Sequence, residues 1–110
     1  MYSNSADPPR RPARTVPDLR RMKIAGERIA SLTAYDASFA RAMDVAGIDV
    51  VLVGDSLGMV VQGGANTVSV SVADMLYHSR CVAKGLQQAL LIAAFLGRTR
   101  LIDNLEFKIP

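Results

Sequence analysis

The sequence predicts an α/β protein in which helices alternate with the strands of a parallel sheet. Half of the 110 residues are hydrophobic and 21% are charged, which is enough apolar material for the core of one small domain. Segments with helical periodicity alternate with short apolar runs. The clearest run, residues 49–53, has the continuous apolar character of a strand buried on both faces. Three strands with two crossover helices make an incomplete piece of a larger α/β fold.

The first part of the chain is predicted to form a tail, a helix and a strand. Residues 1–14 combine prolines, serines and arginines, which offer nothing to bury, so we expect a disordered basic tail. A helix is predicted over 15–25, with Thr15 as its N-cap and Gly26 just past its end. A short strand is expected at 29–33.

The central part is predicted to form a helix, the main strand and a long loop. Asp36 is placed to cap a helix that carries apolar residues at helical spacing and ends at Gly47. The strand at 49–53 follows and ends abruptly at Gly54. The glycine-containing segment 54–70 is expected to be a loop.

One more helix and one more strand are predicted after this loop. Ser71 begins the helix, with Asp74 in capping-box position, and Gly85 ends it. The third strand is expected over 89–93. The buried side of the helix is predicted to consist of Met75, Leu76, Ser79, Val82 and Ala83.

Composition excludes several classes of protein. Cys81 is the only cysteine, which rules out a disulfide framework and a cysteine-built zinc site. The apolar runs are too short for a membrane helix, and no apolar segment precedes Pro17, so no secretory signal is expected. We therefore expect a cytoplasmic protein without a membrane or nucleic-acid partner, and we interpret the arginines of residues 10–14 as part of a solvated tail.

The functional site is expected just past the carboxyl ends of the strands, where parallel α/β folds place their catalytic and binding residues. There Asp55 offers a hard oxygen ligand for magnesium, and Ser56 offers a hydroxyl and a backbone N–H to a carboxylate or carbonyl. Gly-Asp-Ser is also ordinary turn chemistry, and position alone leaves both interpretations open. Tyr35 and Asp36 follow the first strand and should lie at the same edge, with Asp36 as a helix cap in the simpler interpretation.

A short string and a longer set of motifs suggest two different families. Gly-Asp-Ser-Leu at residues 54–57 resembles the esterases and lipases named after that string, in which the serine (here Ser56) is the nucleophile. Such enzymes need a histidine base with an aspartate three residues before it. His78, the single histidine, has Asp74 four residues before it, and the Gly-x-Asn-Asp block of that family is missing. We interpret His78 as a packing or hydrogen-bonding residue.

The longer resemblance covers roughly residues 15–93. Its motifs occur in order and at the right spacing: Thr-Ala-Tyr-Asp at 33–36, Val-Gly-Asp-Ser-Leu-Gly-Met at 53–59, Gln-Gly at 62–63, Thr67, and Asp-Met-x-Tyr-His at 74–78. These residues are similar to the N-terminal part of the ketopantoate hydroxymethyltransferase family, also called 3-methyl-2-oxobutanoate hydroxymethyltransferase. The resemblance implies the N-terminal βα units of a (β/α)8 TIM-type barrel, incomplete in this chain.

The resemblance also implies a reaction and its site residues. The family transfers a hydroxymethyl group from 5,10-methylenetetrahydrofolate to 3-methyl-2-oxobutanoate, giving 2-dehydropantoate, in pantothenate biosynthesis. Mg²⁺ polarises the keto acid so that a carboxylate base can form its enolate. By this resemblance Asp55 is a metal ligand, and Asp55 with Ser56 binds the keto acid. The partners implied are the keto acid, the folate co-substrate and further copies of the chain in a homo-oligomer.

The sequence departs from the family near its carboxyl end. Residues 94–110 form a divergent tail, and Ala94 stands where the family has a further metal-binding aspartate. The family's substrate-binding lysine, the glutamate near the metal and the catalytic glutamate base are expected beyond the end of this chain, so no catalytic residue is assigned within it. We therefore expect a chain that is inactive alone. The alternative is a non-catalytic fragment that binds full-length subunits through an open sheet edge.

Overall fold

The computed structural model of the protein describes residues 11–94. Its three strands form one parallel sheet in the order β1-β2-β3. The elements are α1 (Val16–Ile24), β1 (Ser31–Thr33), α2 (Ala37–Val45), β2 (Val50–Gly54), α3 (Leu57–Val60), α4 (Val72–Gly85) and β3 (Leu90–Ala94). The predicted α/β class and parallel sheet are confirmed, in the arrangement of the first βα units of a (β/α)8 barrel.

Side-chain caps fix where three helices begin. Thr15 and Asp18 form a capping box at the start of α1, and Ser71 and Asp74 form another at α4. Asp36 caps α2 through its carboxylate. Each cap satisfies amide groups that have no partner within the first helical turn. The predicted starts of all three helices are confirmed.

The capping carboxylate of Asp74 makes the start of α4 sensitive to acid. The pKa of Asp74 is lowered, chiefly by a backbone hydrogen bond from Ser71 and then by side-chain hydrogen bonds from Gln62 and Ser71. Because the folded pKa lies below the unfolded value of about 3.9, the carboxylate stabilises the fold above that pH. This contribution is lost as the pH falls through the folded pKa.

Asp74→Asn should therefore flatten the acid side of a curve of Tm against pH. The matched control is Glu27→Gln, which removes an exposed carboxylate before β1 and should leave the acid side of the curve unchanged. A series of melts monitored by circular dichroism between pH 2 and 7 (roughly the range over which carboxylates titrate) compares the variants. An Asp74→Asn curve that follows the wild type at every pH would show that the charge of the cap contributes nothing.

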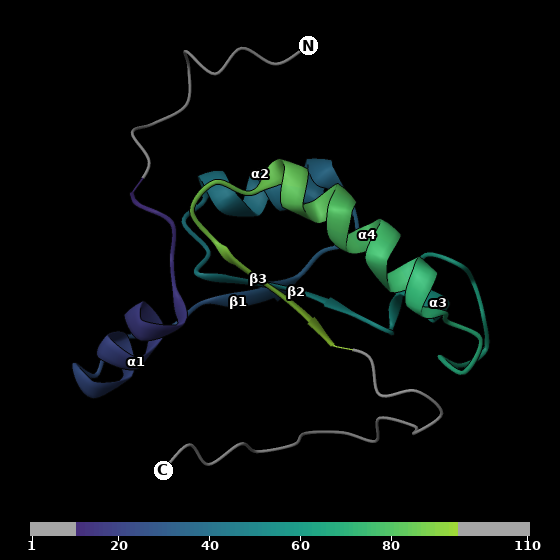
Figure 1. The fold of residues 1–110 in the computed structure, drawn as a ribbon, viewed down its shortest axis with the longest axis horizontal. Helices are drawn as coiled ribbons and strands as arrows, with labels where there is room; N and C mark the ends of the chain where they lie inside the picture. Colours follow the sequence, from purple (N-terminus) through teal and green to yellow (C-terminus); the bar gives the residue numbers. More distant parts are fainter. Residues whose placement is uncertain (1–10, 95–110) are drawn as a thin grey trace.

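Helices α2 and α4 lie side by side and pack on one face of the sheet (Figure 1). Val51 and Val53 of β2 are both 0% exposed at the centre of the core. Ala40 of α2 and Val82 of α4 belong to the same cluster. Because neighbouring side chains of a strand point to opposite faces, the core lies between β2 and these two helices.

The other face of the sheet is less covered. Thr33, Leu52 and Ile92 are aligned across the three strands by the register, and they point away from the core valines. Thr33 is exposed and Ile92 is 40% exposed. In a closed barrel this is the face that turns toward the barrel interior.

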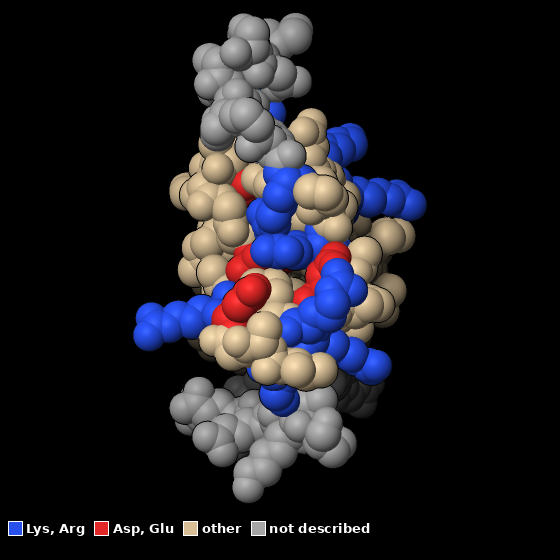
Figure 2. Space-filling view, turned by 90° about the vertical axis from the view of Figure 1, so that its left-hand side faces the viewer, with Lys and Arg blue, Asp and Glu red and all other residues tan. Residues whose placement is uncertain are grey.

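Residues 11–14 are fixed at the amino end of the sheet. The Oδ1 atom of Asp49 accepts hydrogen bonds from Arg11 Nη2 at 3.2 Å and Arg14 Nε at 3.0 Å, and Oδ2 accepts one from the Ala30 amide at 2.9 Å. Figure 2 views the molecule from this side and shows basic and acidic side chains interleaved at its centre. The predicted disorder over 1–14 is therefore wrong for residues 11–14, because a buried carboxylate needs charged partners. Residues 1–10 lie outside the described part.

The strand boundaries differ by one or two residues from the prediction. β1 begins at Ser31 rather than at residue 29, and β3 runs one residue later than the predicted 89–93. Ala94, predicted as the first residue of the divergent tail, is the last residue of β3. The rest of that predicted tail, residues 95–110, lies outside the described residues.

The segment predicted as a loop over 54–70 contains the short helix α3. Leu57, at the start of α3, is 0% exposed and joins the core cluster. Burial of this leucine draws the chain back onto the sheet immediately after β2. The glycines on either side of Leu57 favour a loop by local propensity, so the sequence did not indicate this helical turn. The turn is stabilised by tertiary packing.

The buried side of α4 differs in part from the prediction. Met75 and Val82 are buried as expected, whereas Leu76 is 50% exposed and Ala83 is exposed. The helix is rotated so that His78 rather than Leu76 is half-buried, with its ring bonded to the turn after β1. None of the helices between residues 11 and 94 is both long and apolar enough to cross a membrane.

Candidate functional site

Two turns meet at the carboxyl edge of the sheet. β1 leads into Tyr35, and β2 leads into Asp55 and Ser56; the parallel pairing of Thr33 with Leu52 brings the two turns together. The Tyr35 hydroxyl lies 2.6 Å from Ser56 Oγ, a direct hydrogen bond between the turns. The prediction that the residues after β1 and β2 share one edge is confirmed.

Asp55 is a buried carboxylate with an unused oxygen. Only 2% of Asp55 is exposed, and its Oδ2 atom has no hydrogen-bond partner among the described residues. Leaving a buried carboxylate oxygen without a partner costs free energy. A divalent cation would remove that cost, because Mg²⁺ prefers carboxylate oxygens. The orphaned oxygen therefore fits the magnesium ligand that the sequence suggests.

A magnesium ion at Asp55 would need other ligands as well. Residues 11–94 contain no cluster of three or more His, Cys, Asp or Glu side chains arranged to hold a metal. β3 ends at Ala94, which pairs with Gly54 in the register and so lies beside the start of the Asp55 turn. The resemblance implies an aspartate at position 94, and the methyl group found there cannot bind a cation. Mg²⁺ commonly completes its shell with water and substrate oxygens.

Ser56 is held by Tyr35, and Tyr35 is held in turn by His78. The Nδ1 atom of His78 lies 2.8 Å from the main-chain oxygen of Tyr35. The His78 ring also meets the ring of Tyr77 edge-on, with centroids 5.2 Å apart. The interpretation of His78 as a packing and hydrogen-bonding residue is confirmed.

This geometry does not support the esterase alternative. A catalytic base would bond to the hydroxyl of the nucleophile. Here Ser56 Oγ bonds to the Tyr35 hydroxyl, and His78 Nδ1 is directed at the main chain. Asp74, the aspartate nearest to His78 in the sequence, belongs to the capping box of α4, where its carboxylate accepts a hydrogen bond from the Ser71 amide.

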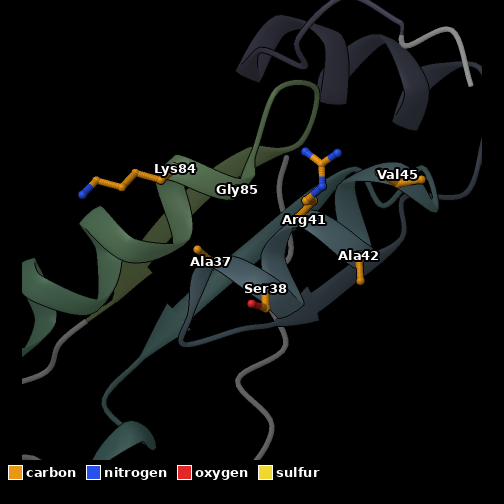
Figure 3. Close-up of a pocket in the computed structure, with 7 residues that line it drawn as sticks. All are labelled: Ala37, Ser38, Arg41, Ala42, Val45, Lys84 and Gly85. Atoms are coloured by element: carbon orange, nitrogen blue, oxygen red, sulfur yellow. The ribbon is translucent and has the colours of Figure 1, made fainter. Parts of the chain in front are cut away.

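Two surface hollows of the described residues lie beside α2, and the lining of one of them includes Tyr35. The larger, of about 620 Å³, lies between α2 and the end of α4; its lining comprises small side chains together with Arg41 and Lys84 (Figure 3). Neither Asp55 nor Ser56 lines it. The smaller, of about 370 Å³, is lined by Tyr35 and Asp36 and by apolar side chains of α2 and α3. Asp55 and Ser56 do not line the smaller hollow either, which shares only Tyr35 with the site.

Comparison with known proteins decides between the two resemblances. The sequence profile described as Ketopantoate hydroxymethyltransferase matches residues 13–97, which include every element from α1 to β3. The chain belongs to the ketopantoate hydroxymethyltransferase family. Family membership confirms the longer resemblance and agrees with the barrel-type βα units observed.

Individual ketopantoate hydroxymethyltransferases are similar over the same region. The 3-methyl-2-oxobutanoate hydroxymethyltransferase of Neisseria meningitidis is 58% identical over 79 residues, covering 72% of this chain and 30% of the relative. That of Xylella fastidiosa is 60% identical over 78 residues, covering 71% and 29%. That of Methylobacillus flagellatus is 62% identical over 74 residues, covering 67% and 28%. The chain thus spans about 30% of the length of the curated relatives it matches.

Proposed function

We propose that this chain carries the metal- and keto-acid-binding part of a 3-methyl-2-oxobutanoate hydroxymethyltransferase site. The reaction is transfer of a hydroxymethyl group from 5,10-methylenetetrahydrofolate to 3-methyl-2-oxobutanoate, giving 2-dehydropantoate for pantothenate biosynthesis. The observation that carries the proposal is the buried, unbonded Oδ2 of Asp55 beside Ser56 at the carboxyl edge. The family membership and the names of the relatives support 3-methyl-2-oxobutanoate as the acceptor of the hydroxymethyl group. The folate donor is the one that the family resemblance implies.

Asp55 and Ser56 have separate roles in this proposal. Asp55 Oδ2 binds Mg²⁺, which when bound polarises the keto group of the substrate. The Ser56 hydroxyl donates a hydrogen bond to a carboxylate or keto oxygen of the same substrate. Neither residue is the base that abstracts the proton, and that role falls to a carboxylate outside residues 11–94. We also propose that the protein forms a homo-oligomer and is located in the cytoplasm.

The proposal is tested by titrating the chain with 3-methyl-2-oxobutanoate in a calorimeter, with and without Mg²⁺. Binding should require Mg²⁺. Asp55→Asn should weaken Mg²⁺-dependent binding by about 100-fold, because removing a metal ligand costs at least as much as removing a residue that supports one. Glu27→Gln is the matched control and should bind as the wild type does. Keto-acid binding that is independent of Mg²⁺, or unchanged in Asp55→Asn, would contradict the proposal.

Ala94→Asp should have the opposite effect to Asp55→Asn and strengthen Mg²⁺ binding. The register places position 94 beside Gly54 and hence next to the Asp55 turn, so a second carboxylate there should strengthen Mg²⁺ binding by about tenfold. The same titration measures it. No gain in Ala94→Asp would show that position 94 does not face the metal.

A second candidate function is suggested by strand β1. All three residues of β1 are exposed, and β1 pairs with β2 on one side only in the described sheet. An exposed strand edge can pair with another chain. A non-catalytic fragment of this kind would bind a full-length subunit, and co-purification with the Neisseria meningitidis relative tests it. A stable complex that Leu32→Lys abolishes would support this function, and independent elution would contradict it.

A further inference from the structure

Tyr35 and His78 form a connected chain of hydrogen bonds with Ser56 that metal binding does not explain. Ser56 Oγ lies 2.6 Å from the Tyr35 hydroxyl, and the Tyr35 main-chain oxygen lies 2.8 Å from His78 Nδ1. The three residues come from the turn after β2, the turn after β1 and helix α4. A cation on Asp55 requires neither Tyr35 nor His78, so metal binding gives no reason for the hydrogen bonds of these two residues.

The bond from His78 has a defined direction. A main-chain carbonyl oxygen only accepts hydrogen bonds, so the Nδ1 atom of His78 carries the proton. This bond ties the turn after β1 to α4 and thereby fixes the backbone of Tyr35. The edge-on contact with Tyr77, at an angle of 88° between the rings, holds the imidazole from another side.

The bond between Ser56 and Tyr35 can run in either direction, and its surroundings favour one of them. A serine hydroxyl has a single proton. If Ser56 gave that proton to Tyr35, Ser56 would present only lone pairs to a site that already contains the Asp55 carboxylate. An acceptor oxygen of a ligand would then face the lone pairs of Ser56 Oγ with no proton between the two oxygens. If Tyr35 donates instead, the Ser56 proton is free to bond a ligand oxygen, and the phenol is the more acidic donor of the two.

We propose that Tyr35, held in place by His78, donates to Ser56 Oγ and so directs the Ser56 proton toward an oxygen of the substrate. Tyr35 and His78 are positioning residues, because they act through Ser56. The consequence is a preference for ligand groups that only accept hydrogen bonds, such as a carboxylate or a keto oxygen. The identity of that ligand as the keto acid rests on the proposed function, whereas the direction of the hydrogen bonds does not.

Nuclear magnetic resonance tests the hydrogen-bond chain without any ligand. The Cζ resonance of Tyr35 reports the bonding of its hydroxyl, and Tyr77, which is 64% exposed, provides the reference for a tyrosine facing water. Ser56→Ala and His78→Ala should move the Tyr35 resonance toward that of Tyr77. His78→Asn should keep it near the wild-type value, because an asparagine amide can donate from the position of Nδ1. A Tyr35 resonance that is the same in all of these variants would overturn the proposal.

Keto-acid binding tests the consequence. With Mg²⁺ present, Tyr35→Phe should bind 3-methyl-2-oxobutanoate about tenfold more weakly, the cost of one misdirected hydrogen bond to a charged group. Its affinity for Mg²⁺ alone should be unchanged, and Tyr77→Phe should match the wild type. Equal keto-acid affinity in Tyr35→Phe and wild type would overturn the proposal. If the wild type binds no keto acid, the proposed function fails, and the Tyr35 resonance still decides whether the hydrogen-bond chain exists.

Discussion

Asp44→Ala should remove a large part of the free energy of unfolding of the protein. Asp44 is 0% exposed at the end of α2, and its carboxylate accepts hydrogen bonds from the amides of Gln87 at 3.1 Å, Gln88 at 3.0 Å and Ala89 at 2.8 Å. Alanine would leave these amide groups without a partner in the interior. At about 1–3 kcal/mol for each such group, the loss is about 4 kcal/mol, a large part of the roughly 5–15 kcal/mol that stabilises a typical domain.

Asp36→Ala is the matched control. Asp36 also accepts a backbone amide at the end of a helix, but it makes a single bond to Phe39, which is exposed. Its removal should cost about 1 kcal/mol. Urea unfolding followed by circular dichroism compares the two variants. A loss in Asp44→Ala no larger than that in Asp36→Ala would show that the loop before β3 does not depend on the buried carboxylate.

Gly85→Ala should be the next most damaging substitution. A Cβ atom at position 85 would lie 2.5 Å from the main-chain oxygen of Ala37 and 2.9 Å from the main-chain nitrogen of Arg41. Backbone atoms cannot move aside as a side chain can, so α2 and α4 would have to separate. Overpacking of this kind costs about 3 kcal/mol, of which the better helix propensity of alanine offsets about 1 kcal/mol.

The control for Gly85→Ala is Gly47→Ala. Gly47 has a φ of 89° and no atom within 4 Å of an added Cβ, so that substitution costs only backbone strain of about 1 kcal/mol. Thermal melts of both variants measure the difference. If Gly85→Ala is as stable as the wild type, the close approach of α2 and α4 at this glycine does not limit the packing of the two helices.

Local signals explain why much of the fold could be predicted. Thr15, Asp36 and Ser71 accept hydrogen bonds from amides within three residues of themselves. A short stretch of sequence is therefore enough to predict where each helix starts. Asp44 and Asp49 instead bond to residues at least 19 positions away, at the ends of other elements. No local pattern distinguishes such a carboxylate from one on the surface. For that reason the ordering of residues 11–14 by Asp49 could not be predicted.

The candidate site also contains residues that local sequence predicts and contacts that it does not predict. Asp55 and Ser56 could be placed at the carboxyl edge because they directly follow the most apolar strand. The bond from Tyr35 to Ser56 depends on the register of β1 with β2, and the approach of His78 depends on the rotation of α4. The prediction of Leu76 on the buried side of α4 was wrong for this second reason. Neither the register nor the rotation is specified by residue spacing alone.

The proposed metal site at Asp55 is tested most directly by replacing Mg²⁺ with paramagnetic Mn²⁺, which prefers the same oxygen ligands. Amide signals of the described chain are followed by nuclear magnetic resonance as Mn²⁺ is added. If Asp55 holds the metal, signals of residues 54–58 and 34–36 should broaden first and those of Gly26 and Glu27 should persist. Asp55→Asn should abolish this pattern. Broadening centred on the amino end of the sheet near Asp49, with residues 54–58 unaffected, would contradict a metal site at Asp55.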